Sequence, residues 1–257
     1  MTLSYIVSGF AVGLLVGLTG VGGGSLMTPL LTLLFGISPT VAVGTDLAFA
    51  SATKVAGTFA HRFRGNVQWD IVRRLCLGAL PAAVAATLVL KYFGGLDDSI
   101  AQIIRYSIAG SVMLTVLAIL FRTRMQRWMA AHPQYQLEGS RQATATVIAG
   151  VVLGTLVTIS SIGAGAVGAT LLVLLYPKLK PAEIAGTDIA YAVPLTAIAA
   201  LGHWWIGSIN WALLIMLLIG SVPGITLGSL AARAVPDKLL RGLLAVTLTG
   251  VAFKLVF

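Results

Sequence analysis

The chain has 257 residues, of which 58% are hydrophobic and only 10% are charged, and its mean hydropathy is +0.96. A soluble domain carries roughly 25% charged residues because its surface faces water, so this composition excludes a soluble fold and predicts a protein embedded in lipid. The net charge of +9 does not indicate nucleic-acid binding, because the basic residues lie in short loops between apolar segments rather than in one stripe.

Ten apolar segments follow one another along the chain, and most approach the roughly 20 residues that a membrane-spanning helix needs. They occupy residues 3–20, 25–36, 39–60, 70–93, 99–121, 142–160, 165–176, 181–202, 210–235 and 237–256. We interpret the first as a membrane helix rather than a signal peptide, because it has no basic leader and no small-residue cleavage site. Cys76 is the single cysteine, which excludes an intrachain disulfide and a cysteine-based metal cluster.

Two of these segments, 25–36 and 165–176, are too short to span the bilayer unaided. Each follows a glycine-rich break, GLTGVGGGS at 17–25 and SSIGAGAVG at 160–168. Irregular backbone at membrane depth is tolerated only where protein buries it or a wet cavity solvates it. We therefore predict a half-helix after each break.

A shift of 142 positions aligns the first half of the chain with the second through residue types that seldom coincide by chance. The matches are Pro39 with Pro181, Gly44, Thr45 and Asp46 with Gly186, Thr187 and Asp188, His61 with His203, Gly65 with Gly207, Trp69 with Trp211, Gly78 with Gly220, and Pro81 with Pro223. Duplication followed by divergence explains this pattern. We predict an all-α integral membrane fold with two repeats, 1–121 and 142–257, joined by a cytoplasmic linker at 122–141.

The charges in the loops predict how the two repeats are oriented. Five crossings per repeat would invert the second repeat, whereas four crossings with re-entrant half-helices would leave the repeats parallel. Only five crossings place the basic loops on one side and the acidic turn at 94–99 on the other. We therefore expect an inverted repeat, a plan typical of transporters that bind substrate at the repeat interface near the midplane.

The glycine-rich breaks are the first candidate binding site. Glycine lets the backbone approach a ligand closely, and the half-helix after each break presents free N–H groups and a positive dipole end. Two such ends would form a cradle for a small oxyanion, although the glycines could instead serve close helix packing. The hydroxyl donors expected there belong to Thr19, Ser25, Thr28, Ser160 and Ser161.

A charged residue deep inside an apolar segment is costly and indicates function, and Asp46, Lys54 and Asp188 are the candidates of this kind. Asp46 and Asp188 are either proton-coupling sites, because burial favours the neutral acid, or groups that cap the half-helices or pair with a cation. Lys54 lies on roughly the same helix face as Asp46; it either attracts an anion, which we favour, or neutralises Asp46. His61 and His203 fall at helix ends, where we expect interfacial hydrogen bonds rather than metal binding.

Two long stretches, 13–69 and 161–211, resemble the TauE/SafE sulfite exporter family, also called the TSUP family. The resemblance rests on GVGGGS followed by a proline and on GTDLA in the first half, and on GAGAVG and GTDIA in the second. It implies a membrane carrier of sulfite, sulfonates or related sulfur anions or, in some members, of small carboxylates. Family motif positions fall here on Gly22, Gly23, Gly24, Pro29, Thr45 and Asp46, and on Gly163, Gly165, Thr187 and Asp188.

We therefore predict a multi-pass carrier in the cell (inner) membrane that transports a small sulfur-containing anion. The expected direction is export of sulfite or an organosulfonate, and proton coupling is a hypothesis; a carboxylate carrier and a passive anion channel remain as alternatives. The sequence contains no Ser-His-Asp order, HExxH or Walker motif, so we expect no enzyme, cofactor or metal. The expected partners are the anion, lipid and protons, without nucleic acid, and the oligomeric state stays open.

Overall fold

The protein is described by a computed structural model that covers residues 2–19, 24–63, 65–93, 98–231 and short pieces between 242 and 254. The described residues form α1 (Thr2–Thr19), α2 (Gly24–Leu34), α3 (Pro39–Phe63), α4 (Trp69–Tyr92), α5 (Asp98–Ala131), the 3₁₀ turn η1 (Pro133–Tyr135), α6 (Gly139–Ser160), α7 (Ala166–Leu175), α8 (Pro181–Ile206) and α9 (Trp211–Ala231). The prediction of an all-α fold is confirmed.

Five of the described helices are long and apolar enough to cross a membrane. They are α4, residues Ile100–Ala131 of α5, α6, α8 and residues Trp211–Gly228 of α9. Large apolar side chains such as Leu77, Ile148 and Ile219 are exposed on the outside of these helices. Such a surface is stable against lipid and not against water, so the prediction of a multi-pass membrane protein is confirmed.

The two shortest apolar helices are α2 and α7, which have 11 and 10 residues. At about 1.5 Å per residue each is about 15 Å long, which is half of the roughly 30 Å hydrocarbon core. Both agree with the predicted half-helices. In contrast, the polar stretch predicted as a linker is largely helical, because α5 continues to Ala131 and only residues 132–138 separate it from α6. Its Arg, Met, Gln and Ala residues are good helix formers.

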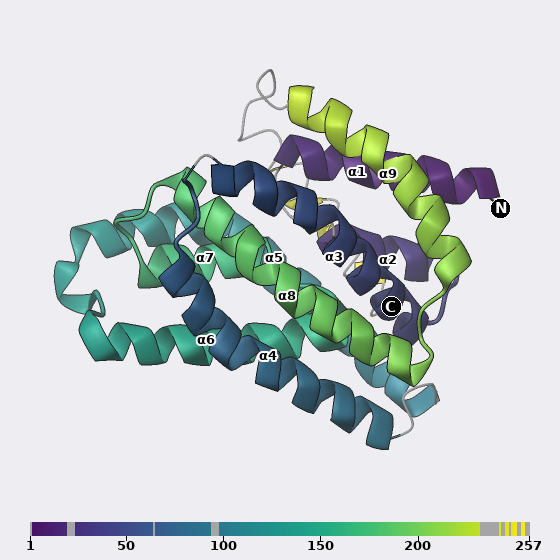
Figure 1. Cartoon of the computed structure of the whole chain (residues 1–257), viewed down its shortest axis with the longest axis horizontal. Helices are drawn as coiled ribbons and strands as arrows, with labels where there is room; N and C mark the ends of the chain where they lie inside the picture. The colour runs from purple at the N-terminus through teal and green to yellow at the C-terminus, as the bar shows by residue number, and fades with distance from the viewer. Residues whose placement is uncertain are drawn as a thin grey trace.

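The two halves of the chain are packed into each other rather than side by side. Figure 1 shows α1 along α9, α4 along α6, and α3 along α8, and each of these pairs takes one helix from each half. Glycines permit this close packing: a Cβ on Gly220 of α9 would collide with the backbone of Ile6, and a Cβ on Gly150 of α6 would collide with that of Leu75. The halves therefore share one interior.

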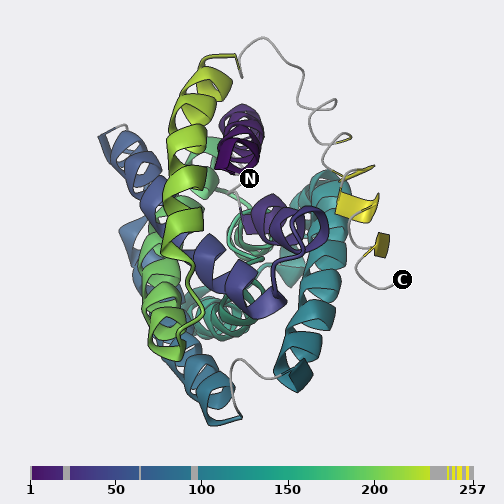
Figure 2. The same cartoon turned by 90° about the vertical axis from the view of Figure 1, so that its right-hand side faces the viewer.

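Helices α3 and α8 run antiparallel through the middle of the bundle. Gly44, near the start of α3, packs against Ser208 after the end of α8, and Gly186, near the start of α8, packs against Asn66 after the end of α3. Since α3 and α8 are the matched helices of the two repeats, their opposite direction supports the predicted inversion. In Figure 2, α5 lies on the opposite side of the bundle from α9.

Candidate functional site

The second glycine-rich break turns the chain between α6 and α7 inside the bundle. Ser161, Gly163 and Gly165 have positive φ angles of 59°, 132° and 136°. Angles as large as the last two are accessible to glycine and strongly disfavoured for other residues, which explains the two glycines. Helix α7 then begins at Ala166. In its first turn, the N–H groups of Gly168 and Ala169 donate to the carbonyls of Gly163 and Gly165 at 2.9 and 2.8 Å.

The two serines at the start of this break have different surroundings. The Ser160 hydroxyl donates to the Leu156 carbonyl at 2.7 Å and accepts from the Ile162 N–H at 3.2 Å, so it satisfies the local backbone. The Ser161 hydroxyl is buried beside the Asp46 carboxylate but has no partner in hydrogen-bond geometry within the described part of the chain. Of the two predicted donors, Ser161 is the one available to a ligand.

Asp46 and Lys54 of α3 connect the first half to this break. The Thr28 hydroxyl of α2 donates to Asp46 Oδ2 at 2.5 Å. The ammonium group of Lys54 donates to the carbonyl of Ala164, in the middle of the break, at 3.2 Å. It also interacts electrostatically with both Asp188 and Asp46. Lys54 therefore lies within electrostatic reach of both carboxylates, and its role toward an anion remains a prediction.

Asp188 of α8 lies at the N-terminus of α7, beside the backbone of Gly165. A Cβ on Gly168 would collide with Asp188 Oδ1 and would crowd the hydroxyl of Tyr191. The contact of these two groups with α7 therefore requires glycine at position 168. Arg122, near the end of α5, acts on Asp188 electrostatically. The carboxylate of Asp188 thus occupies the N-terminus of α7, which the sequence predicted as part of the anion-binding site.

Together these side chains form what we call the central polar cluster. It comprises Thr28, Asp46, Lys54, Ser161, Asp188 and Tyr191. Their exposed fractions are 0–8%. Within the described residues, four of their polar atoms have no hydrogen-bond partner: Asp46 Oδ1, Ser161 Oγ, Asp188 Oδ1 and the Tyr191 hydroxyl. Buried polar groups are almost always paired, so four such atoms in one cluster indicate a binding or proton-exchange site.

Sequence reasoning did not identify Tyr191, Gly168 or Arg122. Tyr191 could have been found, because it lies three residues after Asp188 and therefore on the same helix face. Arg122 was interpreted as an orientation signal, and its charge at the end of an apolar segment gives no indication of the partner it meets. Gly168 stands among other small residues and was not distinguished from them.

Thr45 and Thr187, which the sequence placed at the substrate site, contact the connectors between helices. Thr45 Oγ1 accepts from the Asn210 N–H, and Thr187 Oγ1 accepts from the Gln68 N–H, both at 3.1 Å. Asn210 and Gln68 are themselves related by the shift of 142 positions. Each threonine therefore anchors the connector of the opposite repeat, and its contact with substrate remains a prediction.

The first glycine-rich break is largely outside the described residues. Gly22 and Gly23 are not described, and for Thr19, Gly24 and Ser25 only the helical backbone is described. Thr28 is thus the one predicted donor of the first half whose side chain can be placed. The His61 side chain is also outside the description. His203 lies near the end of α8, is fully buried and makes hydrogen bonds with both ring nitrogens.

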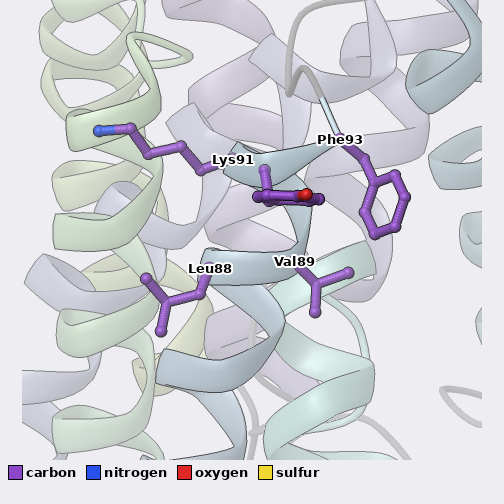
Figure 3. A pocket seen from close by; sticks show the side chains of 5 residues that line it. Leu88, Val89, Lys91 and Phe93 are labelled. Carbon is purple, nitrogen blue, oxygen red and sulfur yellow. The ribbon is translucent and has the colours of Figure 1, made fainter.

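A surface cavity of about 450 Å³ lies at the end of α4, away from the central polar cluster. Leu88, Val89, Lys91, Tyr92 and Phe93 line it. In Figure 3 the Lys91 side chain points away from Phe93, and its ammonium group lies over the Trp205 ring, 3.1 Å from the ring centre. The other lining side chains are apolar and largely exposed, so this cavity has the character of a lipid-facing surface.

An all-helical membrane bundle with a buried polar cluster between two interlocked halves is the architecture of a membrane transporter. The comparisons agree. A family model described as "Sulfite exporter TauE/SafE" matches residues 5–255, and the chain belongs to this family. No solved structure shows a significant match.

Relatives of this chain carry transporter names without a substrate. The chain is 36% identical over 229 residues to "Probable membrane transporter protein YjnA" of Bacillus subtilis, covering 89% of each chain. It is 28% identical over 251 residues to "Probable membrane transporter protein YdhB" of the same organism, covering 96% of this chain and 97% of the relative. The transporter class and the cell-membrane location are therefore established, and the substrate is not.

Proposed function

We propose that this protein is a secondary carrier of a small sulfur-containing anion, such as sulfite or an organosulfonate, and that it moves the anion by alternating access of its two repeats. The observation that carries this proposal is Lys54, a buried cation that bonds to the second break and interacts electrostatically with two carboxylates. Its ammonium group and the Ser161 hydroxyl are donors that a small oxyanion would need.

The same geometry supports coupling to protons. The carboxylates of Asp46 and Asp188 already balance the charges of Lys54 and Arg122, so a bound anion competes with the carboxylates for these cations. An unpaired charge in a buried site costs several kcal/mol. Protonation of one carboxyl group removes the competitor and releases Lys54 to the anion. The proton and the anion are therefore expected to bind together.

Asp188 is the better candidate for the coupling carboxyl group. Asp46 is held by the Thr28 hydroxyl, which stabilises the ionised form. Asp188 Oδ1, like Asp46 Oδ1, has no hydrogen-bond partner among the described residues, but it lies against Gly168 with the equally unpaired Tyr191 hydroxyl. A neutral Asp188 could donate to an oxyanion, whereas an ionised Asp188 would repel it.

The membrane potential is consistent with export under this scheme. A dianion that leaves with one proton still carries one net negative charge. An inside-negative potential drives that charge outward, by about 2.3 kcal/mol per 100 mV. For a dianion the membrane potential therefore favours export.

Transport in proteoliposomes tests the coupling. Wild-type protein should accumulate radiolabelled sulfite when a pH gradient is imposed. Asp188→Asn, which mimics the permanently neutral acid, should retain exchange of sulfite for sulfite and lose the pH-driven accumulation, whereas Asp46→Asn should keep the accumulation. If both variants still accumulate sulfite on the gradient, the proton-coupling mechanism is wrong.

Competition experiments in the same vesicles test the substrate class. Sulfite and organosulfonates should inhibit uptake of labelled sulfite, and lactate should not. Inhibition by lactate alone would indicate the carboxylate carrier instead. Anion conductance far above carrier turnover, without accumulation against a gradient, would indicate a passive channel.

A further inference from the structure

We propose that His203 is a positioning residue that caps the broken end of α6 and so holds the second break in the geometry that binds the anion. The inference rests on the proposed function, because the break that His203 holds contains Ser161 and the Ala164 carbonyl, which face Asp46 and Lys54. The sequence placed this histidine at a membrane interface. In the structure it is fully buried inside the bundle.

Both ring nitrogens of His203 have partners from different elements. Nε2 donates to the Thr158 carbonyl of α6 at 2.9 Å, and Nδ1 lies 2.8 Å from the Ser208 hydroxyl in the connector between α8 and α9. Ser208 in turn packs against Gly44 of α3. His203 therefore joins α6 and α8 to the connector between α8 and α9, at a point where α3 also contacts this connector.

The bond to Thr158 satisfies a carbonyl that α6 itself leaves without a partner. The last carbonyls of a helix have no N–H group one turn ahead. The Val157 carbonyl accepts from the Ser161 N–H at 2.7 Å, but the next N–H, that of Ile162, bonds to the Ser160 hydroxyl at 3.2 Å. Without His203 the Thr158 carbonyl would therefore lack a donor in the apolar interior, which is unfavourable for a buried polar group.

The position of this cap connects it to the central polar cluster. Thr158 lies three residues before Ser161, in the last turn of α6. A shift of that turn would move Ser161 away from Asp46 and the Ala164 carbonyl away from Lys54. Because a carbonyl can only accept, the proton of the neutral ring is assigned to Nε2, and Nδ1 is then an acceptor. The Ser208 hydroxyl has Nδ1 and the His203 carbonyl, at 2.8 and 3.0 Å, as its two acceptors. The Nε2–H group is therefore the functional part of the side chain.

Two substitutions separate the two ring nitrogens. His203→Gln places an amide N–H donor close to the position of Nε2, whereas His203→Asn places one close to the position of Nδ1 and leaves the Thr158 carbonyl unpaired. In proteoliposomes with labelled sulfite, we expect His203→Gln to keep a KM near that of the wild type. His203→Asn should raise KM by roughly tenfold with little change in kcat, because a displaced break weakens binding in the ground state and transition state alike.

Hydrogen exchange provides a readout that does not depend on the substrate. Backbone amides of residues 158–163 should exchange faster in His203→Asn than in His203→Gln or the wild type. Equal KM values and equal exchange in both variants would overturn the proposal, as would equal loss in both with a lowered melting temperature, which would indicate a general packing role. If wild-type protein transports no sulfur anion, the proposed function fails, and the exchange comparison still decides the role of His203.

Discussion

At the scale of single residues, Lys54 shows how one buried charge can determine the behaviour of its neighbours. The side chain reaches from α3 to the Ala164 carbonyl, 110 positions away in the sequence, and its charge acts on Asp46 and Asp188. Removing one partner of a buried ion pair leaves the other uncompensated, which is costly, whereas removing both can be nearly neutral. Lys54 therefore has a structural and a functional role that mutations can separate.

We expect Lys54→Met to destabilise the fold by about 3–5 kcal/mol, because two buried carboxylates lose their cation. The double variant Lys54→Met with Asp188→Asn should recover much of that loss. Neither the single nor the double variant should transport sulfite. Thermal unfolding in detergent measures the stability, and sulfite exchange measures the function. A single variant as stable as the wild type would show that Lys54 does not balance the cluster.

At the scale of helices, the contacts between the halves depend on glycines placed at the crossing points. Gly220 of α9 and Gly150 of α6 each lie against the backbone of a helix from the other half. Gly110 of α5 is also helical, but nothing lies within 4 Å of its would-be Cβ. The three glycines look alike in the sequence, and only the packing distinguishes them.

These glycines allow a matched comparison. Gly220→Ala should destabilise the protein by about 1–3 kcal/mol, because the added methyl group overlaps the Ile6 backbone. Gly110→Ala should be neutral or stabilising by up to about 1 kcal/mol, because alanine favours the helix. Melting temperatures of the two variants in the same detergent check this. Similar shifts for both would contradict the importance of the α1–α9 contact.

At the scale of the whole molecule, the antiparallel course of α3 and α8 supports two inverted repeats. The paired hydrogen bonds of Thr45 and Thr187, one at each end of these helices, have the same symmetry. An inverted repeat gives the protein two related conformations that open to opposite sides. Under the predicted orientation, the connector after α5 lies inside the cell and the end of α4 lies outside.

Cysteine labelling tests this orientation. In a Cys76→Ser background, which removes the chain's single cysteine, Gly95→Cys should react with a membrane-impermeant maleimide in intact cells, because the acidic turn at 94–99 is predicted to lie outside. Ser140→Cys, at the exposed start of α6, should react only after permeabilisation. The reverse pattern would invert the topology, and reaction of both in intact cells would show that α5 does not cross the membrane.

The amino-acid sequence by itself determined the membrane class and the family and predicted the duplication and the two short helices, because hydrophobicity, residue periodicity and glycine placement act locally along the chain. It also identified Asp46, Lys54, Asp188 and Ser161, since charged and polar groups are rare in apolar segments. Among these features, the second break and α7 were placed almost to the residue.

Only the tertiary structure decided which of the polar groups meet. The contact of Lys54 with the second break, the place of Asp188 at the end of α7, and the diversion of Thr45 and Thr187 to the connectors all depend on how helices rotate and cross. Those angles follow from side-chain packing between segments more than 100 positions apart, which no local pattern records. His203 shows this most clearly. It lies near the end of α8, and it is buried because α6 and the connector between α8 and α9 pack against it.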